Sequence, residues 1–83
     1  MENENDEIGR ELTVAELQPN QLVVIRPPGR RFYITAWVEA IDPKTVTFYL
    51  GDLKLYIVNL IVDNRIIDDQ SRQVHIFEYL GTP

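Results

Sequence analysis

The sequence predicts a small, mostly β domain: a five-stranded antiparallel barrel with one short N-terminal helical turn. Two observations predict it. Apolar and polar side chains alternate over several short stretches, which is typical of half-buried strands. Turn-forming residues, chiefly proline, glycine and aspartate, separate these stretches at short intervals. With 83 residues, the chain has room for one domain.

The beginning of the chain is acidic and polar. Such a segment cannot bury enough apolar surface to offset the entropy of ordering it. We therefore expect a disordered acidic leader over residues 1–9 and a single domain over residues 10–83. Thr13 and Glu16 have the spacing of a capping box, and Pro19 ends any helix soon after. These three residues predict one helical turn.

Five stretches have the residue pattern of strands. They are Leu22–Arg26, Arg31–Asp42, Thr45–Leu50, Leu53–Asp63 and Arg72–Leu80. The first connection is the turn Pro27-Pro28-Gly29, and the second is Asp42-Pro43-Lys44. The third is Gly51-Asp52, a two-residue hairpin loop in which Gly51 would supply a positive φ.

The alternation also predicts how the strands pair. Apolar residues occupy even positions in the second strand, from Phe32 to Ala40, and in the third, where Val46, Phe48 and Leu50 face the core. Paired residues share a face, so the three-residue loop places Trp37 opposite Tyr49 and Ala40 opposite Val46.

In the fourth strand, simple alternation does not place all the apolar residues on the core face. A two-residue loop at Gly51-Asp52 turns Leu53, Leu55 and Ile57 inward. The same parity would bury Asn59, which is costly. We therefore expect a bulge near Val58-Asn59 that returns Leu60 and Val62 to the core. A strand bent in this way would help a short sheet curl into a barrel.

In strand number and spacing, residues 12–80 resemble the SH3-like or Tudor-like barrels at the level of the fold. No family motif accompanies the resemblance, so no functional residue is carried over from it. An OB-like barrel is the alternative. It usually carries a substantial helix before its fourth strand, and the sequence predicts none there.

Catalytic and metal-binding chemistry finds little support. The chain has no cysteine and one histidine, His75, which excludes thiolate sites and disfavours zinc or copper. Asp68 and Asp69 are adjacent in a turn-rich loop without EF-hand spacing. No nucleophile and base can be paired, so we expect a protein that is not an enzyme and uses no metal or cofactor.

Charge patterning identifies one candidate anion site. Residues 1–16 have a net charge of −5 and residues 17–83 a net charge of 0, so the folded part lacks a general attraction for nucleic acid. Arg26, Arg30 and Arg31 nevertheless flank one turn. If Ile25 pairs with Phe32, Arg26 lies opposite Arg31, and the three guanidinium groups could bind a phosphate. A barrel that binds nucleic acid or another anion is therefore the alternative function.

The main candidate site is an aromatic outer face. On the predicted pairing, the side of the sheet opposite the core carries Val24, Tyr33, Trp37, Tyr49 and Tyr56. Tyrosine and tryptophan are enriched at interfaces. Three kinds of cover are open: the segment with Leu12, Val14 and Leu17, the last strand, or another molecule.

We interpret the chain as a non-enzymatic interaction module that forms a homo-oligomer, most simply a dimer, with Trp37 between the subunits. A peptide or protein ligand is the other candidate occupant of this face. The absence of cysteine and of a long apolar segment favours a soluble, cytoplasmic protein without a membrane partner.

Overall fold

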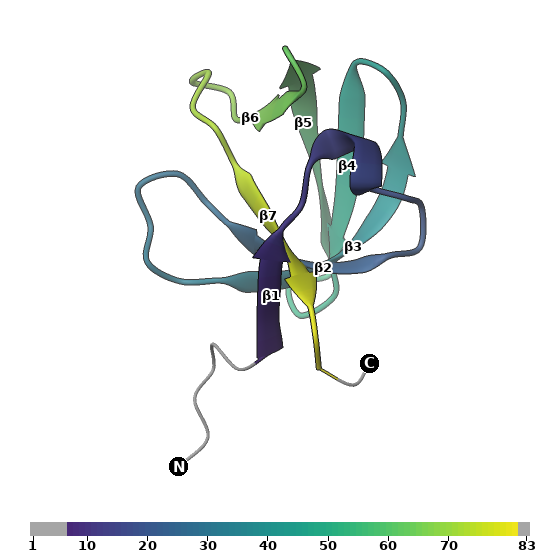
Figure 1. Cartoon of the computed structure of the whole chain (residues 1–83), viewed down its shortest axis with the longest axis vertical. Helices are drawn as coiled ribbons and strands as arrows, with labels where there is room; N and C mark the ends of the chain where they lie inside the picture. The colour runs from purple at the N-terminus through teal and green to yellow at the C-terminus, as the bar shows by residue number, and fades with distance from the viewer. Residues whose placement is uncertain (1–6, 82–83) are drawn as a thin grey trace.

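The computed structural model describes residues 7–81, and it is mostly β (Figure 1). Its elements are β1 (Ile8–Glu11), the 3₁₀ turn η2 (Val14–Glu16), β2 (Leu22–Arg26), β3 (Ile34–Ile41), β4 (Thr45–Leu50), β5 (Leu55–Val62), β6 (Arg65–Ile67) and β7 (His75–Tyr79). The strands form one antiparallel sheet in the order β1-β7-β2-β3-β4-β5-β6. The expectation of a mostly β domain is confirmed.

The sheet curls but does not close into a barrel. β6 meets the chain just before β7, where the Val74 N–H donates to the Ile66 carbonyl at 2.8 Å and Ile67 bridges to Gln73. No continuous ladder joins them. The predicted five-stranded SH3-like or Tudor-like barrel is therefore not confirmed: the sheet has seven strands and remains open.

Two short strands account for the difference in number. β1 begins at Ile8 and pairs with β7, so ordered structure starts before the boundary that we predicted after residue 9. Residues 1–6 of the predicted leader lie outside the described part of the chain. β6 follows a two-residue turn at Asp63 and Asn64, both with positive φ (53° and 61°), as hairpins of this length require.

The core lies inside the curl of the sheet. Its fully buried side chains come from alternate positions of the strands, among them Val23, Ala36, Val38, Val46 and Phe48. The inward positions of the third predicted strand are thus confirmed. Leu17 joins this core, and Leu12 and Val14 pack against it. Leu12, Val14 and Leu17 therefore cover the inside of the sheet and not the predicted aromatic outer face.

The register of β3 and β4 follows the prediction over half its length. Trp37 lies opposite Tyr49, as expected. An irregularity between Val38 and Ala40 then shifts the ladder by one residue, so Ala40 faces Thr47 and not Val46. Ile41 takes the position opposite Val46 and packs against the core. The predicted pairing of Ala40 is wrong because a bulge inserts one extra residue.

The first hairpin is wider than predicted. Ile25 pairs with Ile34, not with Phe32, so β3 begins three residues later than expected. Phe32 is 50% exposed and does not enter the core. Arg26 faces His75 of β7, and the predicted opposition of Arg26 and Arg31 is wrong.

The β4–β5 hairpin also differs from its prediction. Leu50 pairs with Leu55, which leaves a four-residue loop, Gly51–Lys54. Gly51 does not adopt a positive φ, whereas Lys54 does (54°). The two-residue hairpin assigned to Gly51-Asp52 is therefore wrong.

β5 is regular from end to end, and the bulge expected near Val58-Asn59 is absent. Asn59 lies opposite Val46, on the inward side, and is half-buried. Its side-chain amide donates to the Ile67 carbonyl of β6 at 3.0 Å, which satisfies the polar group. With Asn59 inward, Leu60 and Val62 point outward, opposite to our expectation.

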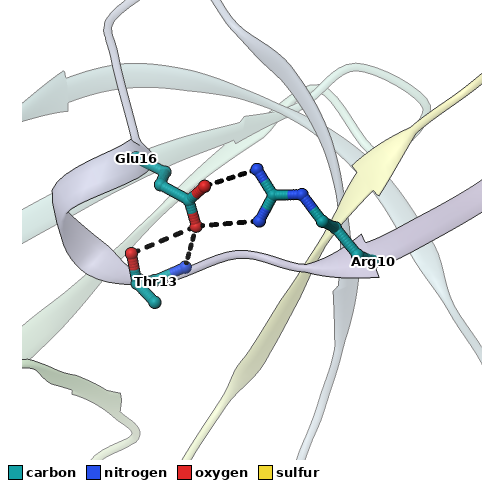
Figure 2. A network of polar contacts seen from close by, with 3 residues as sticks. All are labelled: Arg10, Thr13 and Glu16. Carbon is teal, nitrogen blue, oxygen red and sulfur yellow. Dashed lines mark hydrogen bonds and ion pairs between the residues drawn. The ribbon is translucent and has the colours of Figure 1, made fainter.

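The predicted helical turn is present. Figure 2 shows the Glu16 carboxylate reaching back to the Thr13 N–H (2.9 Å) and hydroxyl (3.1 Å) and forming an ion pair with Arg10 of β1. These contacts lower the pKa of Glu16 to about 2, with the Arg10 hydrogen bond as the largest cause. The capping residues thus also attach β1 to the turn.

Candidate interaction surface

The central part of the predicted aromatic face forms one row across four strands. Leu22 pairs with Trp37, Trp37 with Tyr49, and Tyr49 with Tyr56, so all four side chains lie on the outer side of β2 to β5. The Tyr49 and Tyr56 rings have centroids 4.9 Å apart and are tilted by 47°. The sequence-based grouping of Trp37, Tyr49 and Tyr56 matches this row.

The remaining two predicted members lie in a second cluster near β7. Tyr33 packs edge-on against Phe77, with ring centroids 5.8 Å apart. The Arg26 guanidinium lies 5.7 Å from the centre of the same Phe77 ring. Val24, which pairs with Phe77 across β2 and β7, is only 3% exposed. The chain itself therefore covers this part of the outer face, and Val24 is not available to a partner.

The outer side of β5 is the largest exposed apolar feature near the aromatic row. Every second residue of this strand points outward: Tyr56 is 62% exposed, Val58 63%, Leu60 52% and Val62 46%. We call these four residues, together with Trp37 (39% exposed), the β5 patch. With roughly 150–250 Å² for a fully exposed large side chain, these fractions correspond to about 500 Å². None of the five is charged.

Three members of the β5 patch were missed from the sequence. The sequence predicts a bulge near Val58 and places Leu60 and Val62 in the core, because burial of Asn59 without a partner is costly. The hydrogen bond from Asn59 to β6 removes that cost, but β6 itself was not predicted. A regular alternation through Val62 was the signal that could have identified them.

The three arginines of the predicted anion site have different surroundings. Arg26 packs on Phe77, whereas Arg30 and Arg31 are exposed and make no ion pair with any residue between positions 7 and 81. A fourth arginine approaches from another loop: a Cβ at Gly29 would lie 4.0 Å from Arg72 Nη1. Arg72 is itself paired with Asp68 at 3.1 Å.

A groove of about 230 Å³ lies beside β5, on the inner side of the sheet. Leu50 and Ile57 form one wall, Pro27 and Pro28 belong to the opposite turn, and Arg30 is also part of the lining. We call it the edge groove. It is separate from the β5 patch because Ile57 points inward and its neighbours Tyr56 and Val58 point outward.

Three titratable side chains, those of His75, Asp42 and Asp68, make local contacts within the fold. The Nδ1 of His75 lies 2.5 Å from a Glu11 carboxylate oxygen. Backbone N–H groups of the turns lower the pKa of Asp42 and of Asp68, chiefly those of Lys44 and Arg72 respectively. Within residues 7–81, no three histidine or carboxylate side chains gather as metal ligands would.

Comparison with family models, curated proteins and solved structures finds no match for this chain. Among the described residues, no helix has the length and apolar character needed to cross a membrane. What the protein binds must therefore be inferred from its own surface.

Proposed function

We propose that this protein is a non-enzymatic interaction module that self-associates through the β5 patch. The observation that carries the proposal is the outward row on β5, four consecutive outward positions that are apolar and about half exposed. The largest apolar patch of a monomeric protein is usually about 300–600 Å² and often functional, and the β5 patch falls in this range.

A second copy is the occupant that the chemistry favours. The β5 patch has no charge, so it offers nothing to select a charged partner, and two identical uncharged faces do not repel each other. Its area of about 500 Å² is a large part of the roughly 800 Å² that each partner buries in a standard interface. Trp37 and Tyr56 supply the aromatic anchors that interfaces concentrate near their centre.

The test is the molar mass in solution. Sedimentation equilibrium of the full chain from about 1 to 100 μM spans the dissociation constants expected of such an interface. We expect an oligomer, most simply a dimer, at the upper end. Leu60→Asp should make the protein monomeric without a large change in circular dichroism, because Leu60 is outside the core.

Leu80→Asp is the matched control. Leu80 has the same side chain and similar exposure (58%), but it follows β7 and donates its N–H to the Glu7 carbonyl beside β1. It should remain oligomeric. A wild-type protein that is monomeric at about 100 μM, or a control that dissociates as readily as Leu60→Asp, contradicts the proposal.

A further inference from the structure

One edge of β5 is paired with a neighbouring strand over only part of its length. β5 has eight residues, whereas its neighbour β6 has three and pairs only with Leu60, Ile61 and Val62 (Figure 1). On this side, the backbone of residues 55–59 has no strand partner within the described part of the chain. Proteins usually protect such edges with charge, proline or a bulge. Residues 55–59 have none of these.

The edge groove lies next to the open half of β5. Its lining includes Ile57 and Asn59 from the inner side of β5, so a chain that pairs with this edge would place alternate side chains in the groove. The groove is also lined by Pro27, Pro28 and Val74, which are apolar. Its preferred occupants are therefore apolar side chains at every second position of an extended chain.

The dimensions favour one isolated strand. Residues of the 27–30 turn and of the segment before β7 line the same groove as β5, so it is bounded on both sides. The edge of a second β5 would bring its own β4 alongside and meet this far wall. About 230 Å³ is also below the usual range of small-molecule pockets, roughly 300–1,000 Å³.

Charge sets a further preference. Arg30 lines the groove and is exposed, and it has no ion pair among residues 7–81. The other two charged residues of the lining, Arg72 and Asp68, are paired with each other at 3.1 Å, so their opposite charges offset. A carboxylate on the bound chain would therefore meet an available guanidinium group at Arg30.

We propose that the edge groove binds a single extended peptide segment, which adds a strand to residues 55–59 of β5, inserts apolar side chains between β5 and the 27–30 turn, and presents an acidic residue to Arg30. This is the β-augmentation mode of peptide recognition. It uses the edge and inner side of β5, so it goes beyond the proposed self-association, which uses the outer side.

The probe is the capped hexapeptide Asp-Val-Thr-Val-Thr-Asp, with an aspartate at each end to serve either strand direction. Titration into ¹⁵N-labelled full-length protein at pH 7 should shift the amide signals of residues 55–59 and the Arg30 Nε–H. The same peptide with lysine at both ends should bind at least about tenfold more weakly, as loss of a charge-assisted hydrogen bond would cause. Absence of binding at millimolar peptide, or equal binding of the two peptides, overturns the proposal.

Two neighbouring variants separate this site from the β5 patch. Ile57→Asp places a carboxylate on the groove side and should abolish peptide binding while the molar mass is unchanged. Val58→Asp alters the outer side and should do the reverse. Arg30→Glu, at an exposed position, should reverse the preference between the two peptides. If dilution of the Val58→Asp variant, which lacks the contact through the β5 patch, still shifts the amides of residues 55–59, a second copy occupies the edge and the peptide proposal is wrong.

Discussion

The outer face of this sheet has two halves that carry similar side chains but differ in solvent exposure. On β2 and β7, Val24 is 3% exposed and pairs with Phe77, whose ring packs edge-on against Tyr33. On β4 and β5, Val58 is 63% exposed although it too lies on the outer side of a strand. Aromatic and β-branched content therefore does not decide which face is free for a partner. What decides it is whether neighbouring parts of the chain cover that face.

The largest expected effect comes from placing the same substitution in both halves. Val24→Asp buries a carboxylate with no partner and should destabilise the fold by about 3 kcal/mol or more. In the monomer, Val58→Asp leaves its carboxylate in water and should cost about 1 kcal/mol or less, the range of strand propensities, so both variants are compared at a protein concentration at which the wild type is monomeric. Thermal unfolding followed by circular dichroism measures both. Equal losses of stability in the two variants would show that Val24 and Val58 are equally exposed to solvent.

Ring truncation gives a smaller version of this contrast. Phe77→Ala removes the ring that contacts both Tyr33 and Arg26 and belongs to the strand partner of Val24, and should cost about 2–3 kcal/mol, below the value for a fully buried phenylalanine. Tyr56→Ala removes one exposed ring stacked on Tyr49, worth about 0.5–1.5 kcal/mol. Urea unfolding gives both values. The open half would be structurally essential if the Tyr56 variant lost as much stability as the Phe77 variant.

The strands could be predicted from the sequence where alternation was uninterrupted. Val46, Phe48 and Leu50 face the core as the even-numbered pattern requires, and Trp37 meets Tyr49 because a three-residue loop keeps parity between the two strands. The same reasoning identified most of the aromatic row. These features depend only on local spacing, which a single sequence contains.

The remaining features depend on contacts between distant segments. The bulge after Val38 adds one residue to β3, and no residue type in that stretch marks it. Asn59 tolerates an inward position because it donates to Ile67, a residue of a strand too short to recognise. An error at Asn59 reverses the predicted faces of Leu60 and Val62, so two of the five residues of the β5 patch are wrongly predicted to lie in the core.

Acid should weaken the attachment of β1 on the covered side. The pKa of Glu16 is lowered to about 2, mainly by Arg10, so the ionised carboxylate stabilises the fold above its unfolded pKa of 4.5. This contribution is lost as the pH falls from 4.5 through about 2.

Glu16→Gln should therefore lower the melting temperature slightly at pH 7, and the difference from wild type should vanish near pH 2. The pKa values of Asp42 and Asp68 are also lowered, but those groups are common to both proteins and cancel in the comparison. A difference that persists unchanged down to pH 2 would mean that the Glu16 charge has no part in the stability.

The smallest effect is expected at the turn that leads into the open half. Gly51 does not have a positive φ, and a Cβ there would meet only Tyr49 Cε2 at 3.8 Å, an ordinary contact. Gly51→Ala should leave the free energy of unfolding unchanged or raise it by up to about 1 kcal/mol, because alanine restricts the unfolded chain more than glycine does. Gly29 is the matched control: its φ is +71°, so Gly29→Ala forces alanine into a left-handed conformation and should cost about 1 kcal/mol. Urea unfolding of the two variants side by side decides the matter. If Gly51→Ala proves the more damaging of the two, the four-residue loop is wrong, and with it the regular register that turns Val58 and Leu60 outward.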